Sequence, residues 1–219
     1  MPRLPRFLLS KSYYHIMTRG NNRNKIFRCD EDYKKYLSLL AFYKEELPFD
    51  LYHYCLMPSH VHMLIRTRSA DSFSVFMKKI NLSYFHYYKH KLDWVGHFWQ
   101  GRFKSQPIGK DDYFIQCGKY IELNPVRANL VNNPKLYKYS SYNYYAYGKS
   151  DSLLTDDIFY SSLENTNRSR QLNYRKLIIN ETIIDTYKKQ TWGNPHQSHN
   201  EQEKIRYHLR KREEDKDSK

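Results

Sequence analysis

The sequence has few cysteines and no long apolar run, and both absences narrow the class of protein. Cys29, Cys55 and Cys117 are the only cysteines among the 219 residues, and they lie far apart. An odd, widely spaced set fits neither a disulfide framework nor a zinc knuckle, so we expect a reduced, cytoplasmic protein. The basic N-terminal segment is followed by too short an apolar stretch for a signal peptide. Without a bilayer-spanning run or a lipidation signal, we expect no membrane association.

Acidic residues are outnumbered by basic ones. The 37 Lys and Arg against 23 Asp and Glu give a formal net charge of +14. Such an excess is typical of proteins with a polyanionic partner, most often nucleic acid. Residues 195–219 are nearly balanced in charge, so the excess belongs to the rest of the chain. The 22 tyrosines allow two interpretations, because rings among cations can stack on single-stranded bases or can simply fill a core.

Hydrophobic periodicity predicts seven elements in the order strand, helix, strand, strand, helix, strand, helix. The predicted strands cover 13–18, 49–57, 60–65 and 102–108, and the predicted helices cover 30–46, 72–89 and 111–123. A link of only Pro58 and Ser59 joins the second and third strands, which must therefore be antiparallel. This order predicts an α+β fold, a ferredoxin-like or RRM-like antiparallel sheet with helices on one face and the other face open.

The third predicted strand alternates apolar residues with two histidines, His60 and His62. Because successive side chains on a strand point to opposite faces, the two imidazoles lie together on the face away from the core. Neutral imidazole is a common ligand of divalent metals, so the pair is a candidate metal site. Two histidines with ordinary hydrogen bonds on a half-buried strand remain the simpler interpretation of this pattern taken alone.

The last predicted helix carries a second candidate group. Tyr113, Tyr120 and Asn124 follow one another at spacings of seven and four residues, which places them on one side of a helix. A phenol and an amide one turn apart can serve as a nucleophile and a further metal or phosphate contact. Asn124 followed by Pro125 can equally be the N-cap and first residue of another helix. Gly118 would let this helix approach the sheet closely.

Five motifs, in this order along the chain, resemble the REP-associated tyrosine transposases, which belong to the single-tyrosine HUH transposases. They are MPR at 1–3, RGNNR at 19–23, MPSHVH at 57–62, QGRFKS at 100–105 and YIELNPVRA at 120–128. The resemblance implies an HUH single-tyrosine transposase domain over 1–150, with the HUH endonuclease fold. We expect a helical C-terminal extension over 151–195. The charged tail over 196–219 has few core-forming residues and is expected to be a solvated helix or disordered.

The resemblance also implies residue roles. His60 and His62 match the metal-binding pair, Tyr120 matches the nucleophile, and Asn124 matches the third protein ligand of Mg²⁺ or Mn²⁺. The candidate DNA-binding residues are Arg19, Asn21, Arg23, Lys25, Arg102, Lys104 and Arg127. The implied substrate is single-stranded DNA with hairpin-forming repeats, and the implied protein is a cytoplasmic, nucleoid-associated monomer or homodimer.

The reaction implied for this site is a transesterification on single-stranded DNA. Tyr120 would attack the scissile phosphorus and leave a 5′-phosphotyrosine and a free 3′-hydroxyl. This link keeps the energy of the phosphodiester, so rejoining needs no ATP, and the sequence lacks the G-x-x-x-x-G-K-[ST] pattern of ATP-binding loops. A phenol with a pKa of about 10 needs help to lose its proton. Lys119 or a metal-bound water could supply it.

Two other functions fit the same residues. The chain could be a non-catalytic binder of structured single-stranded nucleic acid that keeps the fold. It could also be a hydrolytic metallonuclease that uses the same ion and a water molecule, and such an enzyme would form no covalent link with DNA.

Overall fold

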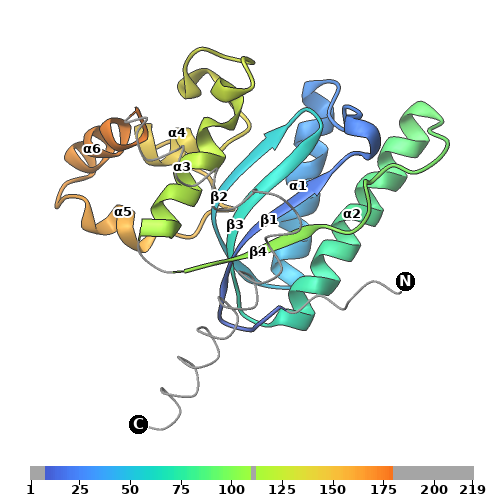
Figure 1. Cartoon of the computed structure of the whole chain (residues 1–219), viewed down its shortest axis with the longest axis horizontal. Helices are drawn as coiled ribbons and strands as arrows, with labels where there is room; N and C mark the ends of the chain where they lie inside the picture. Colours follow the sequence, from blue (N-terminus) through green and yellow to red (C-terminus); the bar gives the residue numbers. More distant parts are fainter. Residues whose placement is uncertain (1–7, 110–111, 180–219) are drawn as a thin grey trace, which may run out of the picture.

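A four-stranded antiparallel sheet forms the centre of the computed structural model, which describes residues 8–109 and 112–179 (Figure 1). The strands stand in the order β2-β3-β1-β4, and each neighbouring pair is antiparallel. They are β1 (Tyr13–Arg19), β2 (Phe49–Met57), β3 (His60–Thr67) and β4 (Lys104–Ile108). The predicted α+β antiparallel fold is confirmed.

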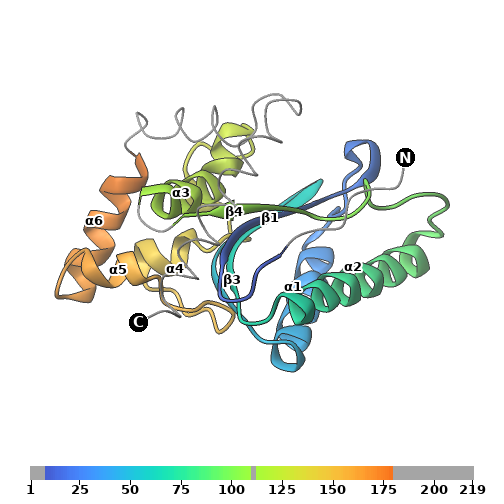
Figure 2. The same cartoon turned by 60° about the horizontal axis from the view of Figure 1, so that its bottom comes forward.

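Helices cover both faces of this sheet. The long helices α1 (Asp30–Glu46) and α2 (Ala70–Leu92) pack on one face, and α3 (Asp112–Arg127) crosses the other (Figure 2). The expectation of an open second face was wrong, because α3 packs against β2 and also contacts β3 and β4. The shorter elements are η1 (Asn21–Arg23), η2 (Pro134–Leu136), α4 (Tyr142–Tyr147), α5 (Ile158–Ser162) and α6 (Asn167–Ile179). No helix in the described part of the chain is long and apolar enough to cross a membrane.

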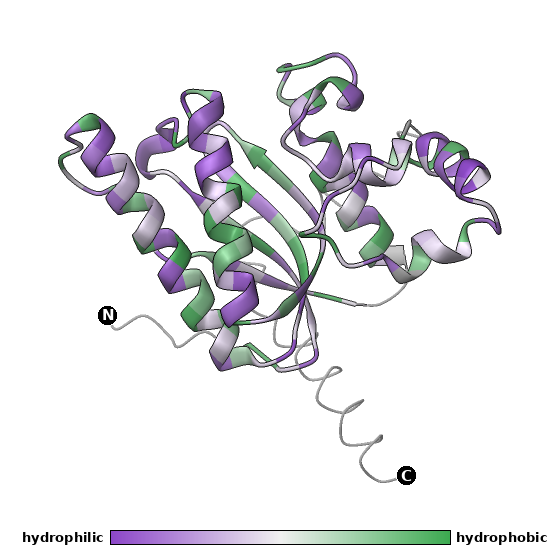
Figure 3. Cartoon of the chain, turned by 180° about the vertical axis from the view of Figure 1, so that it is seen from behind, coloured by the Kyte–Doolittle hydropathy of each residue, from purple (hydrophilic) through white to green (hydrophobic). Residues whose placement is uncertain are grey.

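The main core lies between the sheet and the α1–α2 layer. Hydrophobic residues run along the strands, whereas α1 and α2 alternate between hydrophobic and hydrophilic positions (Figure 3). Several buried tyrosines donate a hydrogen bond from the hydroxyl to a backbone carbonyl. Tyr84 donates to Ile26 at 2.6 Å, and Tyr145, in a second core under α4, donates to Tyr52 at 2.7 Å. For these tyrosines, core filling is the correct interpretation, since a buried phenol needs a partner for its hydroxyl.

Helix α3 approaches β2 closely because Gly118 has no side chain. A Cβ atom at this position would lie 2.7 Å from Nε2 of His53 and 2.9 Å from Cδ2 of the same ring. Phe114 and Ile121, one turn before and just under one turn after Gly118, are fully buried. The predicted close approach of this helix to the sheet is therefore observed, and His53 is the residue that it approaches.

Pro125 lies inside α3 and does not begin a new helix. Proline has no N–H to donate to the carbonyl of Ile121 one turn earlier. The side-chain amide of Asn124 partly replaces that bond, since its Nδ2 donates to Tyr120 O at 3.0 Å and to Ile121 O at 3.4 Å. The interpretation of Asn124 as an N-cap is therefore wrong, and α3 continues to Arg127.

A buried polar network ties α3 to the C-terminal helices. Nδ1 of His53, on β2, lies 2.9 Å from Oε1 of Glu122, and its Nε2 lies 3.4 Å from Oδ2 of Asp157. Glu122 also accepts hydrogen bonds from the hydroxyls of Ser141 at 2.6 Å and Tyr174 at 2.7 Å. Burial alone would lower the pKa of His53, but its bonds to Asp157 and Glu122 outweigh burial and raise the pKa to about 9. The histidine is thus a cation held between two carboxylates.

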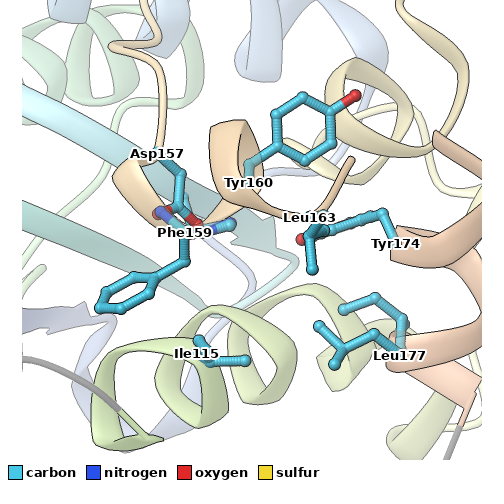
Figure 4. A pocket seen from close by; sticks show the side chains of 9 residues that line it. Ile115, Asp157, Phe159, Tyr160, Leu163, Tyr174 and Leu177 are labelled. Atoms are coloured by element: carbon cyan, nitrogen blue, oxygen red, sulfur yellow. Dashed lines mark hydrogen bonds and ion pairs between the residues drawn. The ribbon is translucent and has the colours of Figure 1, made fainter. Parts of the chain in front are cut away.

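A small hollow lies beside this network, between α3, α5 and α6. Asp157 and Phe159 line it from the start of α5, Ile115 from α3, and Leu177 from α6 (Figure 4). Its volume of about 20 Å³ is that of roughly one water molecule. The hollow is therefore a packing feature of the junction between these helices and has no room for an organic ligand.

Gly118→Ala is expected to lower the free energy of unfolding by about 1–3 kcal/mol, the usual range for overpacking. The His53 ring cannot yield easily because both of its nitrogens are bonded to carboxylates. Gly109→Ala is the matched control, since a Cβ there would meet nothing within 4 Å. Urea unfolding of both variants measures the difference, and equal stability would show that α3 does not depend on this close approach.

The contribution of His53 to the free energy of unfolding is expected to fall as the pH rises from 6.5 through 9. The folded chain raises the pKa of His53 from its ordinary 6.5 to about 9, so the protonated ring stabilises the fold. This contribution, roughly 3 kcal/mol, is fully present below pH 6.5 and is lost above pH 9. Urea unfolding across this range measures it, with His86→Ala, an exposed histidine of α2, as the control that keeps the same dependence. His53→Gln is expected to lose this dependence, and a dependence that this variant keeps would contradict the assignment.

Candidate active site

The structure brings the predicted metal pair and the predicted nucleophile together. His60 and His62 lie on the face of β3 that α3 covers, with ring centroids 4.8 Å apart. The ring of Tyr120, from the middle of α3, stands edge-on to that of His62, with centroids 5.9 Å apart. His62 is fully buried and the other two rings are half-buried, so the group sits at the border between core and solvent.

Both histidines of the pair are neutral, as a metal ligand must be. Burial, with a further contribution from the charge of Arg19, lowers the pKa of His60 to about 4. Burial also lowers the pKa of His62 well below its ordinary value, and the neighbouring histidines and the charge of Arg19 lower it further. The pKa of Tyr120 is raised by burial, although the charge of Arg127 opposes this effect. The phenol therefore holds its proton and needs a base before it can attack.

Hydrogen bonds engage the same nitrogen of each ring. Nδ1 of His60 lies 2.9 Å from the hydroxyl of Ser59, and Nδ1 of His62 lies 2.8 Å from Nε2 of His15. Nε2 is therefore the ligating atom that remains on each ring of the pair. Sequence reasoning missed His15, which stands on β1 with its ring centroid 5.8 Å from that of Tyr120.

Asn124 lies one turn after Tyr120 and is half-buried. Its Nδ2 bonds the helix backbone, so the amide oxygen is the atom that could bind a metal. Within residues 8–109 and 112–179, no group of three or more His, Cys, Asp or Glu is arranged to hold a metal ion. Among the described residues, a third protein ligand beside the histidine pair would therefore have to be a group of another kind, such as this amide.

Two arginines flank the site, and each has a buried N–H group to satisfy. Arg19 ends β1 directly opposite His60, and the guanidinium carbon of Arg127 lies 5.3 Å from the centre of the Tyr120 ring. Arg19 Nε and Arg127 Nη1 are buried and have no hydrogen-bond partner among the described residues. Buried donors are normally paired, and phosphate oxygens are the acceptors that a guanidinium fits best.

The other candidate DNA-binding residues lie on two neighbouring loops. Arg23 and Lys25 are exposed and Asn21 is half-buried on the loop after β1, and Arg102 and Lys104 are exposed at the start of β4. Backbone hydrogen bonds join the loops, from Asn21 N to Phe98 O at 2.7 Å and from Gln100 N to Arg19 O at 2.9 Å. The first loop also bonds the β2–β3 turn, from Gly20 N to Ser59 O, next to His60. The cations thus gather at the histidine end of the sheet.

Lys119, one of the two candidate proton acceptors for Tyr120, is engaged elsewhere. It is fully buried, and its Nζ donates to the carbonyl of Leu177 on α6 at 2.8 Å. The side chain therefore serves the junction between α3 and α6, which makes it a poor candidate for the base.

The sheet, the histidine pair and the tyrosine-bearing helix are those that the resemblance to single-tyrosine transposases predicts. The comparisons with known proteins report on the family and the fold. The family described as "Transposase IS200 like" matches residues 8–124, more than half of the chain. The chain belongs to this family of DNA-cleaving transposases, which confirms the transposase resemblance of its motifs. Curated protein sequences gave no match.

Two solved structures resemble this one. A REP-associated tyrosine transposase bound to a REP hairpin is 19% identical, with a TM-score of 0.57 over 72% of this chain and 93% of that one. A candidate transposase from Deinococcus radiodurans R1 is 18% identical, with a TM-score of 0.38 over 50% of this chain and 88% of that one. The first match, at 19% identity, supports the fold alone. The second has too low a TM-score to support an argument.

Proposed function

We propose that this transposase nicks and rejoins single-stranded DNA through a 5′-phosphotyrosine on Tyr120, at sites next to hairpins, with a divalent metal ion. The observation that carries the proposal is the edge-on contact of Tyr120 with His62. Beside it, two arginines present buried donors that have no partner in the described part of the chain. A nucleophile, a metal-competent pair and an anion site thus meet at one point, as phosphoryl transfer requires.

The residues present fit a divalent ion. Nε2 of His60, Nε2 of His62 and the amide oxygen of Asn124 would hold Mg²⁺ or Mn²⁺, with phosphate oxygen and water completing a hard ligand set. When bound, such an ion polarises the scissile phosphate and stabilises the charge that develops on it.

The chain's own residues carry the other steps. Arg19 and Arg127 donate hydrogen bonds to phosphate oxygens and fix the phosphorus in front of the phenol. Tyr120 loses its proton to water, its oxygen forms a bond to phosphorus, and the bond from phosphorus to the 3′-oxygen breaks. The departing 3′-oxygen takes up a proton. The reverse sequence, with a new 3′-hydroxyl as attacking group, joins the strand again without ATP.

The proposed substrate follows from the neighbouring cations and from the relative. The loops that carry Arg23, Lys25, Arg102 and Lys104 form a positive rim that suits a DNA backbone. The REP-associated transposase with a similar fold was solved with a REP hairpin. We therefore place a hairpin on this rim and the single strand at Tyr120, in a catalytic domain of residues 1–150 that acts in the cytoplasm at the nucleoid, as a monomer or homodimer.

The helical extension proposed for 151–195 includes α5 and α6, and its part beyond residue 179 lies outside the described residues. The proposed tail at 196–219 lies entirely outside them. Two hydrogen bonds join α6 to the tyrosine-bearing helix: Tyr174 donates to Glu122 at 2.7 Å, and Lys119 donates to the carbonyl of Leu177 at 2.8 Å. We infer that its role is to support that helix.

Tyr120→Phe is expected to abolish the covalent adduct with a hairpin-bearing single strand in Mn²⁺, because the phenol oxygen forms the bond. Tyr113→Phe, an exposed tyrosine of the same helix, is the matched control and keeps the adduct. Denaturing gel electrophoresis with labelled DNA reads both. An adduct that survives in the Tyr120 variant contradicts the assignment. Cleavage without any adduct indicates a hydrolytic nuclease, and binding without cleavage indicates a non-catalytic binder.

His62→Ala is expected to weaken Mn²⁺ binding by roughly tenfold or more, since it removes one of two imidazole ligands. His86→Ala removes an exposed histidine of α2 and is expected to change nothing. Electron paramagnetic resonance of free and bound Mn²⁺ measures both, without any need for cleavage. If the two variants bind Mn²⁺ equally well, the metal site lies elsewhere.

A further inference from the structure

The contact between His15 and His62 joins two histidines of neighbouring strands inside the protein. β1 and β3 pair so that His15 faces Leu64 and Met17 faces His62. His15 is therefore the diagonal neighbour of His62 on the face that α3 covers, at a position where side chains can reach each other. Their atoms Nε2 and Nδ1 lie 2.8 Å apart, a short hydrogen bond, and both residues are almost fully buried.

Both rings are neutral, which restricts how this bond can form. His15 and His62 are 1% and 2% exposed, and burying a charged imidazole is costly. A neutral imidazole carries one N–H donor and one acceptor nitrogen. One ring must therefore donate in this contact while the other accepts, and two arrangements of the protons are possible.

Only one arrangement leaves His62 able to bind a metal. If His62 donates from Nδ1, its Nε2 keeps a lone pair that can face an ion. If His15 donates from Nε2, the single proton of His62 is on Nε2 and its Nδ1 lone pair is already used. His60 follows the first pattern without conflict, because the hydroxyl of Ser59 can accept from its Nδ1.

We propose that His15 is a positioning residue of the catalytic site, which accepts the Nδ1 proton of His62 and so turns Nε2 of that ring toward the metal. This inference rests on the proposed metal-dependent function. Partners of this kind commonly orient metal-binding histidines and fix their tautomer. The ring of His15 also stands edge-on to that of Tyr120, with centroids 5.8 Å apart and planes at 69°. The same side chain thus touches both the proposed ligand and the proposed nucleophile.

The first test is the tautomer of His62 in the metal-free protein. Two-dimensional ¹H–¹⁵N spectra of the histidine rings, assigned with His15→Phe and His62→Ala, distinguish a proton on Nδ1 from one on Nε2. We expect His62 to carry its proton on Nδ1 and His15 to present an unprotonated Nε2. A proton on Nε2 of His62 overturns the proposal. This readout needs neither metal nor DNA, so it stands apart from the proposed function.

The second test is Mn²⁺ affinity in two variants of His15. His15→Phe keeps the ring shape but removes the acceptor, and we expect affinity to fall about 10–100-fold. In His15→Gln, the amide oxygen can accept at the place of Nε2, and we expect affinity within a few-fold of the unchanged protein. Equal affinity in all three proteins overturns the positioning role, and so does an equal loss in both variants.

The proposed function fails in a different way. If the unchanged protein binds no Mn²⁺, or if His62→Ala has no effect on binding, the metal site is wrong whatever the tautomer of His62 is. Circular dichroism and thermal unfolding of the Phe and Gln variants show whether each is folded, and the ring spectrum of the unchanged protein decides the matter if either is not.

Discussion

The seating of α3 on β2 is the constraint on which the candidate site depends. Gly118 lets the helix come close, and the bond from Glu122 to His53 fixes its rotation about its own axis. Tyr120 lies between these two residues in sequence, and a rigid helix transmits their placement to it. At about 100° per residue, Tyr120 leaves the helix on a side roughly opposite Gly118 and Glu122. Its ring still reaches the histidine pair from the flank of the helix, with its centroid 5.9 Å from that of His62.

This constraint draws the C-terminal helices into the same unit. Asp157, which caps α5, and Tyr174 of α6 both bond the His53–Glu122 pair, and the ammonium of Lys119 bonds a carbonyl of α6. Each bond joins α3 or its partner on the sheet to a segment far along the chain. A buried ion pair gives weak evidence of net stability, but loss of one member leaves an uncompensated charge. The network therefore adds little net stability to this placement of α3, but any other placement would cost free energy because it would leave a buried charge unpaired.

The sequence predicted the strands and the long helices because alternation and helical spacing are local signals. It also predicted the histidine pair, since two residues on one strand share a face. It did not predict that α3 covers that face, because the apolar side of a helix does not say which surface it meets. His15 and the His53–Glu122 contact depend on strand register and on residues 47 and 69 positions apart. A single histidine on a predicted strand gave no signal until β1 and β3 were paired.

His53 and His62 lie on neighbouring strands of the same sheet face and have opposite charge states. That difference bears on where the chemistry can lie. His53 is charged and lies between the carboxylates of Glu122 and Asp157, so the protein itself balances its charge. Burial, together with the nearby histidines and the cation of Arg19, keeps the pKa of His62 well below its ordinary value, so this ring stays neutral and has a lone pair to offer. Beside His62, Arg19 and Arg127 hold buried donors that have no hydrogen-bond partner among the described residues. In the proposed function, a phosphate group of DNA would accept from these donors, and its negative charge would offset the cost of placing a divalent ion beside an arginine. In the proposed function, the part of the sheet face around His62 is thus the part that a nucleic acid completes.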